Sequence, residues 1–197
     1  MFTWISKATT GAALALLAAC VPPSGFGSAR SAPVLGGAVN IGVPAGYCIA
    51  PDTGRGGADS VVVLMGRCAD TSRAAAALVS VSVGRSASAG VMTAGGPALA
   101  AFFTSAQGRA TLSREGRASD VRVIGALGVG DAFLLHLADR TVGEHWRAII
   151  GVNGRLITIS ATGTASAPLS PTEGRAVVDA TLAALRRANP TAAAAAG

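Results

Sequence analysis

The segment "WRAIIGVNGRLITIS" (residues 146–160) decides how this chain is expected to fold. Two runs rich in apolar and β-branched residues flank the pair Asn153-Gly154. Asn-Gly is the dipeptide that best tolerates the positive φ angles of a type I′ turn, whose twist matches that of a β-hairpin. We therefore predict paired strands near residues 145–151 and 155–161.

Further strands are predicted on the N-terminal side of this hairpin. Residues 78–83 alternate valine with serine over most of their length, which is typical of a strand with one buried face. Other short β-rich runs occur at 39–41 or 47–49, at 61–65, at 121–123 and at 133–137.

Two segments carry helix signals instead. Pro97 introduces a run of good helix formers that ends near Gly108, which predicts one mid-chain helix of about ten residues. The segment 170–173, "SPTE", combines an N-cap serine, a proline at the first helical position and a capping-box glutamate. The second helix should run from there to Asn189-Pro190.

The order of strands, helix, strands and helix predicts a single α+β domain over residues 41–189. We expect a largely antiparallel sheet with one mid-chain helix and a C-terminal helix packed on it. In element order, and without a diagnostic motif, residues 40–189 resemble the PsbP-like α+β domains. That resemblance implies an accessory or assembly factor rather than a catalyst, and it assigns no site residue.

The N-terminal residues indicate where the protein resides. Lys7 precedes a short apolar run over residues 8–19, a pattern typical of a secretory signal and shorter than the roughly 20 residues of a membrane-spanning helix. The run ends Leu17-Ala18-Ala19-Cys20, which resembles the lipobox of bacterial lipoproteins. The resemblance implies cleavage before Cys20 and palmitate-type acylation of the new N-terminus. A buried helix with a chance cysteine, or a secretory signal without lipid, remains the alternative.

Each terminal segment then has an expected role. Residues 1–19 are the predicted signal peptide, and residues 20–40 are the lipidated cysteine with a flexible tether rich in Pro, Gly and Ser. By the same resemblance, Val21 favours the periplasmic face of the outer membrane over the inner membrane. Residues 190–197 are expected to form a disordered tail.

Charge excludes one class of partner. The chain has a formal net charge of +6, and Lys7 is its only lysine. The arginines stand singly apart from Arg186-Arg187, unlike the clustered basic surface of a nucleic-acid-binding protein. We therefore expect no nucleic-acid partner. Attraction to anionic headgroups and a compositional bias toward arginine both remain as explanations of the charge.

The chain has three cysteines, of which Cys20 lies in the lipobox-like segment and Cys48 and Cys68 lie in the predicted domain. With Cys20 lipidated, Cys48 and Cys68 form an even pair in an oxidising compartment, which predicts a disulfide. Closing a loop of this length contributes on the order of 3 kcal/mol to stability. Two free thiols or a metal pair are the alternatives, although a metal site would need further His or Cys ligands at short spacing.

The densest polar cluster is "HLADRTVGEHW" (residues 136–146). If the flanking strands pair, the turn between them gathers His136, Glu144 and His145, which would allow metal binding or acid–base chemistry. The spacing matches no compact ligand motif, so the competing interpretation is a polar turn with one satisfied histidine. Trp146 would be a ligand or partner anchor if it is exposed.

No motif assigns a reaction. The segment "GRGGADS" (residues 54–60) has three glycines, but a strand follows it where a phosphate-binding loop requires a helix. We expect no cofactor and no enzymatic activity. The leading hypothesis is a membrane-anchored, non-enzymatic interaction or accessory module of the cell envelope, with an unknown envelope protein as partner. The alternative is a periplasmic module that binds a small molecule or metal through His136, Glu144 and His145.

Overall fold

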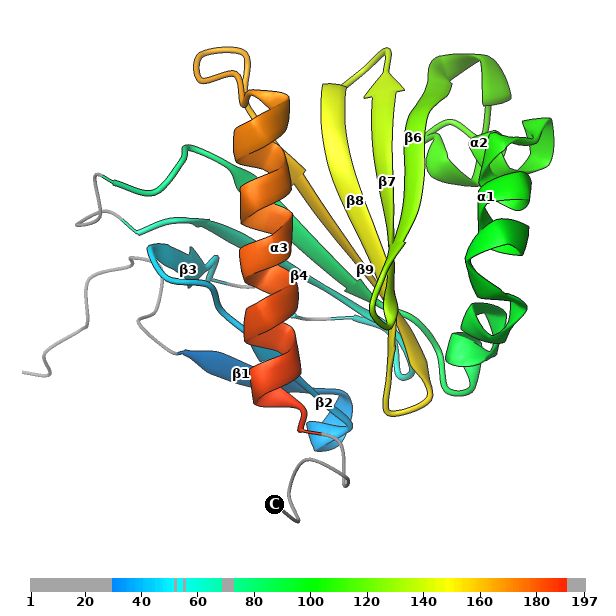
Figure 1. Cartoon of the computed structure of the whole chain (residues 1–197). Coiled ribbons are helices and arrows are strands. Elements are labelled where there is room, and N and C mark those ends of the chain that lie inside the picture. The colour runs from blue at the N-terminus through cyan, green and yellow to red at the C-terminus, as the bar shows by residue number, and fades with distance from the viewer. Residues whose placement is uncertain (1–29, 52, 55, 69–72, 191–197) are drawn as a thin grey trace, which may run out of the picture.

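The computed structural model describes residues 30–51, 53–54, 56–68 and 73–190. They form an antiparallel sheet of seven strands in the order β3-β4-β5-β9-β8-β7-β6, with a two-stranded sheet, β1-β2, beside it (Figure 1). The α+β class with a largely antiparallel sheet is confirmed. The strands are β1 Ser31–Val34, β2 Val39–Gly42, β3 Tyr47–Ile49, β4 Val61–Arg67, β5 Leu78–Val83, β6 Val121–Val129, β7 Ala132–Asp139, β8 Gly143–Val152 and β9 Arg155–Thr162.

The central hairpin forms as predicted. Strands β8 and β9 pair from Trp146 with Ala161 to Val152 with Arg155, and the two-residue turn follows directly. Asn153 has φ 48° and Gly154 has φ 76°, so both turn residues have the positive φ that the Asn-Gly pair tolerates.

The mid-chain helical region is longer than predicted and is broken. It consists of the 3₁₀ segment η2 Ser88–Ala94 and the helices α1 Gly95–Thr104 and α2 Ala106–Leu112. The prediction that the helix ends near Gly108 was wrong, because Ser105 adopts an extended conformation and caps a second helix by accepting a hydrogen bond from Gly108 N at 3.1 Å. Gly108 is required there, since a Cβ at this position would lie 2.0 Å from the carbonyl oxygen of Phe102.

The folded region begins earlier than expected. Residues 31–40, predicted from composition to belong to the tether, contain β1, the turn η1 Leu35–Gly37 and the start of β2. Val34, Val39 and Ile41 are buried, so this segment belongs to the core although its composition is rich in Pro and Gly. The predicted signal peptide, Cys20 and the tail over 191–197 lie outside the described residues.

The C-terminal helix α3 Pro171–Ala188 crosses one face of the large sheet, and β2 packs beside it (Figure 1). Its capping box is present as predicted: Ser170 Oγ accepts from Glu173 N, and Ser170 N donates to Glu173 Oε2 at 3.0 Å. Val178, Leu182 and Leu185 are buried in the core on this side of the sheet.

A smaller core lies on the opposite face. The helices α1 and α2 contact β6 there, and η2 contacts β8 and β9. The buried side chains of this second core are Leu99, Leu112, Val121, Phe133, Leu135, Leu137 and Ile149.

The predicted disulfide is present. Cys48 in β3 is bonded to Cys68, which directly follows β4, and the two Cα atoms are 5.2 Å apart. The bond therefore joins an edge strand to its neighbour. Among the helices described, none is both long and apolar enough to cross a membrane.

Candidate functional site

The predicted cluster of His136, Glu144 and His145 does not form one site. Strands β7 and β8 pair as expected, with His136 opposite Trp146 and Leu137 opposite His145. Because successive side chains of a strand point to opposite faces, His136 and Glu144 lie on the α3 face and His145 lies on the other. The grouping of all three as candidate ligands was therefore wrong.

His136 instead belongs to a stack that joins the sheet to α3. Its ring is parallel to that of Trp146, with centroids 4.4 Å apart, and the guanidinium of Arg175 lies 4.8 Å from the Trp146 ring. His136 Nε2 is 2.7 Å from Glu144 Oε1, without the angle of a hydrogen bond. Trp146 is thus partly buried between two side chains and is not an exposed anchor.

His145 is a core residue of the opposite face. Its side chain is buried, and Nδ1 lies 3.1 Å from the carbonyl oxygen of Gly143. Burial lowers the pKa of His145 below its usual value, and the hydrogen bond with Gly143 partly opposes that change. Within the described part of the chain, no three His, Cys, Asp or Glu side chains are grouped to hold a metal ion.

The face of the sheet opposite α3 is exposed at its β4 end, although helices cover it at its β7 end. One row of side chains crosses the strands from Val62 through Ser82, Thr158 and Ile149 to Phe133. The β7 end of this row lies in the second core beneath the helices, whereas Val62 is 47 % exposed. The helices α1 and α2 therefore leave the β4–β5–β9 part of this face open.

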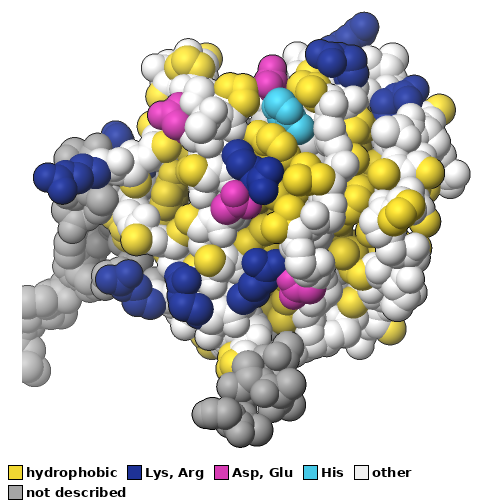
Figure 2. Space-filling model, in the orientation of Figure 1, with side chains coloured by type: hydrophobic (Ala, Val, Ile, Leu, Met, Phe, Trp, Pro, Cys, Tyr) yellow, Lys and Arg dark blue, Asp and Glu magenta, His cyan; other side chains and the backbone are white. Residues whose placement is uncertain are grey.

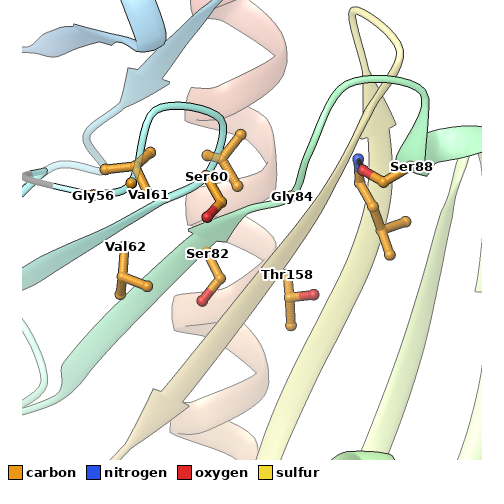
Figure 3. Close-up of a pocket in the computed structure, with 11 residues that line it drawn as sticks. Gly56, Ser60, Val61, Val62, Ser82, Gly84, Ser88 and Thr158 are labelled. Carbon is orange, nitrogen blue, oxygen red and sulfur yellow. Dashed lines mark hydrogen bonds between the residues drawn. The ribbon is translucent and has the colours of Figure 1, made fainter.

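This open part holds a cavity of about 490 Å³, with α3 behind the sheet in the view of Figure 3. Val62, Ser82 and Thr158 contribute side chains from three neighbouring strands, and the glycine-rich loop forms one rim with Gly56 and Ser60 (Figure 3). The cavity is a shallow site with an apolar and hydroxyl-bearing wall.

An ion pair holds the end of the glycine-rich loop to the start of β9. Arg155 Nη2 is 2.7 Å from Asp59 Oδ1, and Nη1 donates to the carbonyl oxygens of Asp59 and Gly84. The hydrogen bond from Arg155 lowers the pKa of Asp59. As predicted, a strand rather than a helix follows the loop, so it lacks the helix N-terminus of a phosphate-binding loop.

A second cavity of about 260 Å³ lies between the helical layer and the sheet. Leu156 and Thr158 line both cavities, so the two adjoin on this face. The wall of the second cavity is mainly apolar and includes Met92, Leu99, Phe103, Leu112 and Ile149.

Arg147 supplies the one charged side chain in the wall of this second cavity. Its Nε donates to Ser160 Oγ at 3.0 Å, and Nη1 donates to the carbonyl oxygen of Leu112 at 3.5 Å. Burial lowers the pKa of Arg147, and the charge of Asp139 acts in the opposite direction. Both of the hydrogen-bond acceptors of Arg147 are neutral groups.

Sequence reasoning missed Arg147, although a signal was present. The residue lies in phase with His145 and Ile149 on a strand whose two faces are both covered, so its side chain had to point inward. An arginine at an inward position is uncommon unless it is paired. Once the coverage of both faces of β8 is known, this rule marks Arg147 as a candidate site residue.

No protein-family model, curated protein or solved structure matches this chain. The indications of its function therefore come from its own residues. On the face shown in Figure 2, the basic side chains are dispersed among hydrophobic and acidic ones and form no continuous basic surface.

Proposed function

We propose that the protein is a lipid-anchored lipoprotein of the bacterial cell envelope that acts without catalysis, as an interaction or accessory module. The observation that carries this proposal is that two of the three cysteines are bonded to each other, which leaves the third for lipidation. Cys48 and Cys68 are joined in a disulfide, and Cys20 stands apart at the end of the lipobox-like segment. A disulfide is typical of proteins that fold outside the cytoplasm.

The anchor would set the location of the domain. Two or more acyl chains bind a protein stably to a membrane, because each buried CH₂ contributes about 0.8 kcal/mol. Residues 21–30 would then separate the domain from the lipid surface. Val21 supports the periplasmic face of the outer membrane as the site of residence.

The open β4–β5–β9 face is the surface we assign to binding. It combines an exposed apolar side chain, Val62, with the hydroxyl groups of Ser82 and Thr158. Exposed apolar side chains next to hydrogen-bonding groups are typical of contact surfaces. The other exposed apolar residues on this side are Leu78, Val91 and Phe102.

The lipid anchor is tested with Cys20→Ala. In cells fed radiolabelled palmitate, the wild type should incorporate label and the variant should not, and the variant should retain its signal peptide. The matched control is Cys48→Ala/Cys68→Ala, which removes the disulfide and should leave labelling intact. Equal labelling of Cys20→Ala and wild type would contradict the proposal.

Partner binding is tested separately by cross-linking in intact cells and affinity purification of the full chain. A stoichiometric envelope protein should be recovered with the wild type and lost with Ser82→Arg, which places a large charge on the open face. Recovery of the same partner by both proteins would show that the contact lies elsewhere.

A further inference from the structure

The cavity between the helices and the sheet joins two features that are seldom found together. Its wall is formed mainly by apolar side chains of η2, α1, α2, β8 and β9, and Arg147 is the one charged group that reaches it. A charged group that leaves water for such surroundings loses hydration, which is costly unless an opposite charge or several hydrogen bonds replace it.

The structure gives Arg147 only part of that compensation. Ser160 Oγ and the carbonyl oxygen of Leu112 are neutral acceptors, and the second of these contacts is long at 3.5 Å. Within the described residues, Arg147 forms no ion pair with a carboxylate, whereas Arg117, Arg155, Arg175 and Arg186 each do. The planar guanidinium matches a carboxylate in shape as well as charge.

We propose that this cavity binds a medium-chain fatty acid, with the carboxylate on Arg147 and the hydrocarbon chain against Leu99, Phe103 and Ile149. A volume of about 260 Å³ exceeds that of the roughly 150 Å³ apolar cavity known to accept benzene. The adjoining open cavity, which shares Leu156 and Thr158, supplies a route from solvent. This inference concerns the folded domain and holds whether or not the chain is lipidated.

Photo-cross-linking of the full chain in phosphatidylcholine vesicles tests the proposal. The probe is lauric acid that carries a diazirine in its chain, and peptide mass spectrometry locates the attached label. In the wild type, we expect label on residues 91–112 or 147–158. Unlabelled lauric acid should compete for this site, and methyl laurate should not, because the ester carries no charge for Arg147 to bind.

Three variants complete the design. Arg147→Gln should reduce labelling of these segments by about tenfold, since it removes a charge-assisted hydrogen bond. Thr158→Phe, which keeps Arg147 and fills the shared wall with a residue well suited to strands, should reduce labelling as strongly. The matched control Arg187→Gln removes an exposed arginine of α3 and should label as the wild type does. Protease resistance of the domain in the same vesicles checks that each variant is folded.

The outcomes separate cleanly. Labelling of Arg147→Gln at the wild-type level, or equal competition by methyl laurate, would overturn carboxylate recognition. Absence of label from the two segments in the wild type would overturn the cavity as a binding site. If Arg147→Gln does not fold, Thr158→Phe and the methyl ester still decide the question. The palmitate experiment tests lipidation of Cys20 and not the cavity. A negative result there would therefore leave the fatty-acid proposal standing.

Discussion

At the scale of single residues, strand parity decides what each polar side chain can do. His136 and His145 are close in sequence and belong to paired strands, yet the sheet separates them. His136 stacks on Trp146, and His145 is buried against the opposite core. Proximity in sequence therefore predicted a shared site that the alternation of side chains along a strand rules out.

The buried His145 predicts a pH dependence of stability. Its pKa is lowered in the folded state, so below the unfolded value of 6.5 the unfolded chain binds a proton that the folded protein does not. The free energy of unfolding should therefore decrease as the pH falls through 6.5, and this decrease should stop below the lowered folded pKa. Urea unfolding at pH values on both sides of 6.5 measures the effect.

His145→Gln should remove this decrease, because glutamine does not titrate. His136→Gln, which removes the other histidine of the chain, should keep it. An unchanged pH dependence in His145→Gln would show that another group is responsible.

Gly42 is a second residue whose role is decided by packing. A Cβ on Gly42 would lie 2.0 Å from the carbonyl oxygen of Ala184 in α3, and backbone atoms cannot move aside as side chains do. We expect Gly42→Ala to lower the free energy of unfolding by about 3 kcal/mol. Gly128→Ala in β6 is the control, because nothing lies within 4 Å of its Cβ position. A similar effect of both substitutions in urea unfolding would contradict this account.

At the scale of elements, the sequence predicted a turn or a helix end correctly where a few adjacent residues fix the backbone. The β8–β9 turn and the start of α3 were predicted because Asn153-Gly154 and the segment 170–173 fix the backbone by their own hydrogen bonding and φ preferences. The break between α1 and α2 was missed, because Ser105 is both a tolerable helix residue and a good N-cap.

The capping box of α3 allows a direct test. Ser170→Ala removes the acceptor for Glu173 N and the donor to Glu173 Oε2, which should cost about 1 kcal/mol in the free energy of unfolding. Thr172→Ala, one residue before Glu173, changes an exposed position without a cap contact and should stay within about 0.5 kcal/mol of the wild type. Equal midpoints of Ser170→Ala and wild type in urea would disprove the contribution.

At the scale of the whole molecule, the sheet has two unequal faces. Helix α3 and β2 cover one face, and the shorter helices α1 and α2 cover only part of the other. The uncovered part adjoins the cavity that contains Arg147. This asymmetry creates the binding surface, and it depends on how far each helical layer extends over the strands.

The disulfide restricts the chain as a whole rather than one element. Cys48 and Cys68 are separated by 20 residues, and their bond restricts the unfolded chain. Reduction, or the double change Cys48→Ala/Cys68→Ala, should lower the free energy of unfolding by about 3 kcal/mol. Calorimetry of oxidised and reduced protein measures this loss. In parallel, alkylation of the denatured, unreduced mature protein should modify neither cysteine, and full modification of both would refute the bond.

The sequence by itself determined the strands near 78–83 and 145–161, the capped helix α3 and the α+β class, and it favoured the pairing of Cys48 with Cys68 that the structure confirms. The strands and the helix depend on patterns among neighbouring residues, and the disulfide depends on the number of cysteines. They can therefore be predicted without knowledge of the fold. Only the tertiary structure decided that residues 31–40 belong to the core, that His145 lies apart from His136 and Glu144, and that Arg147 lines an apolar cavity. Each of these depends on which faces of the sheet the helices cover, and that coverage is set by contacts between residues far apart in the chain.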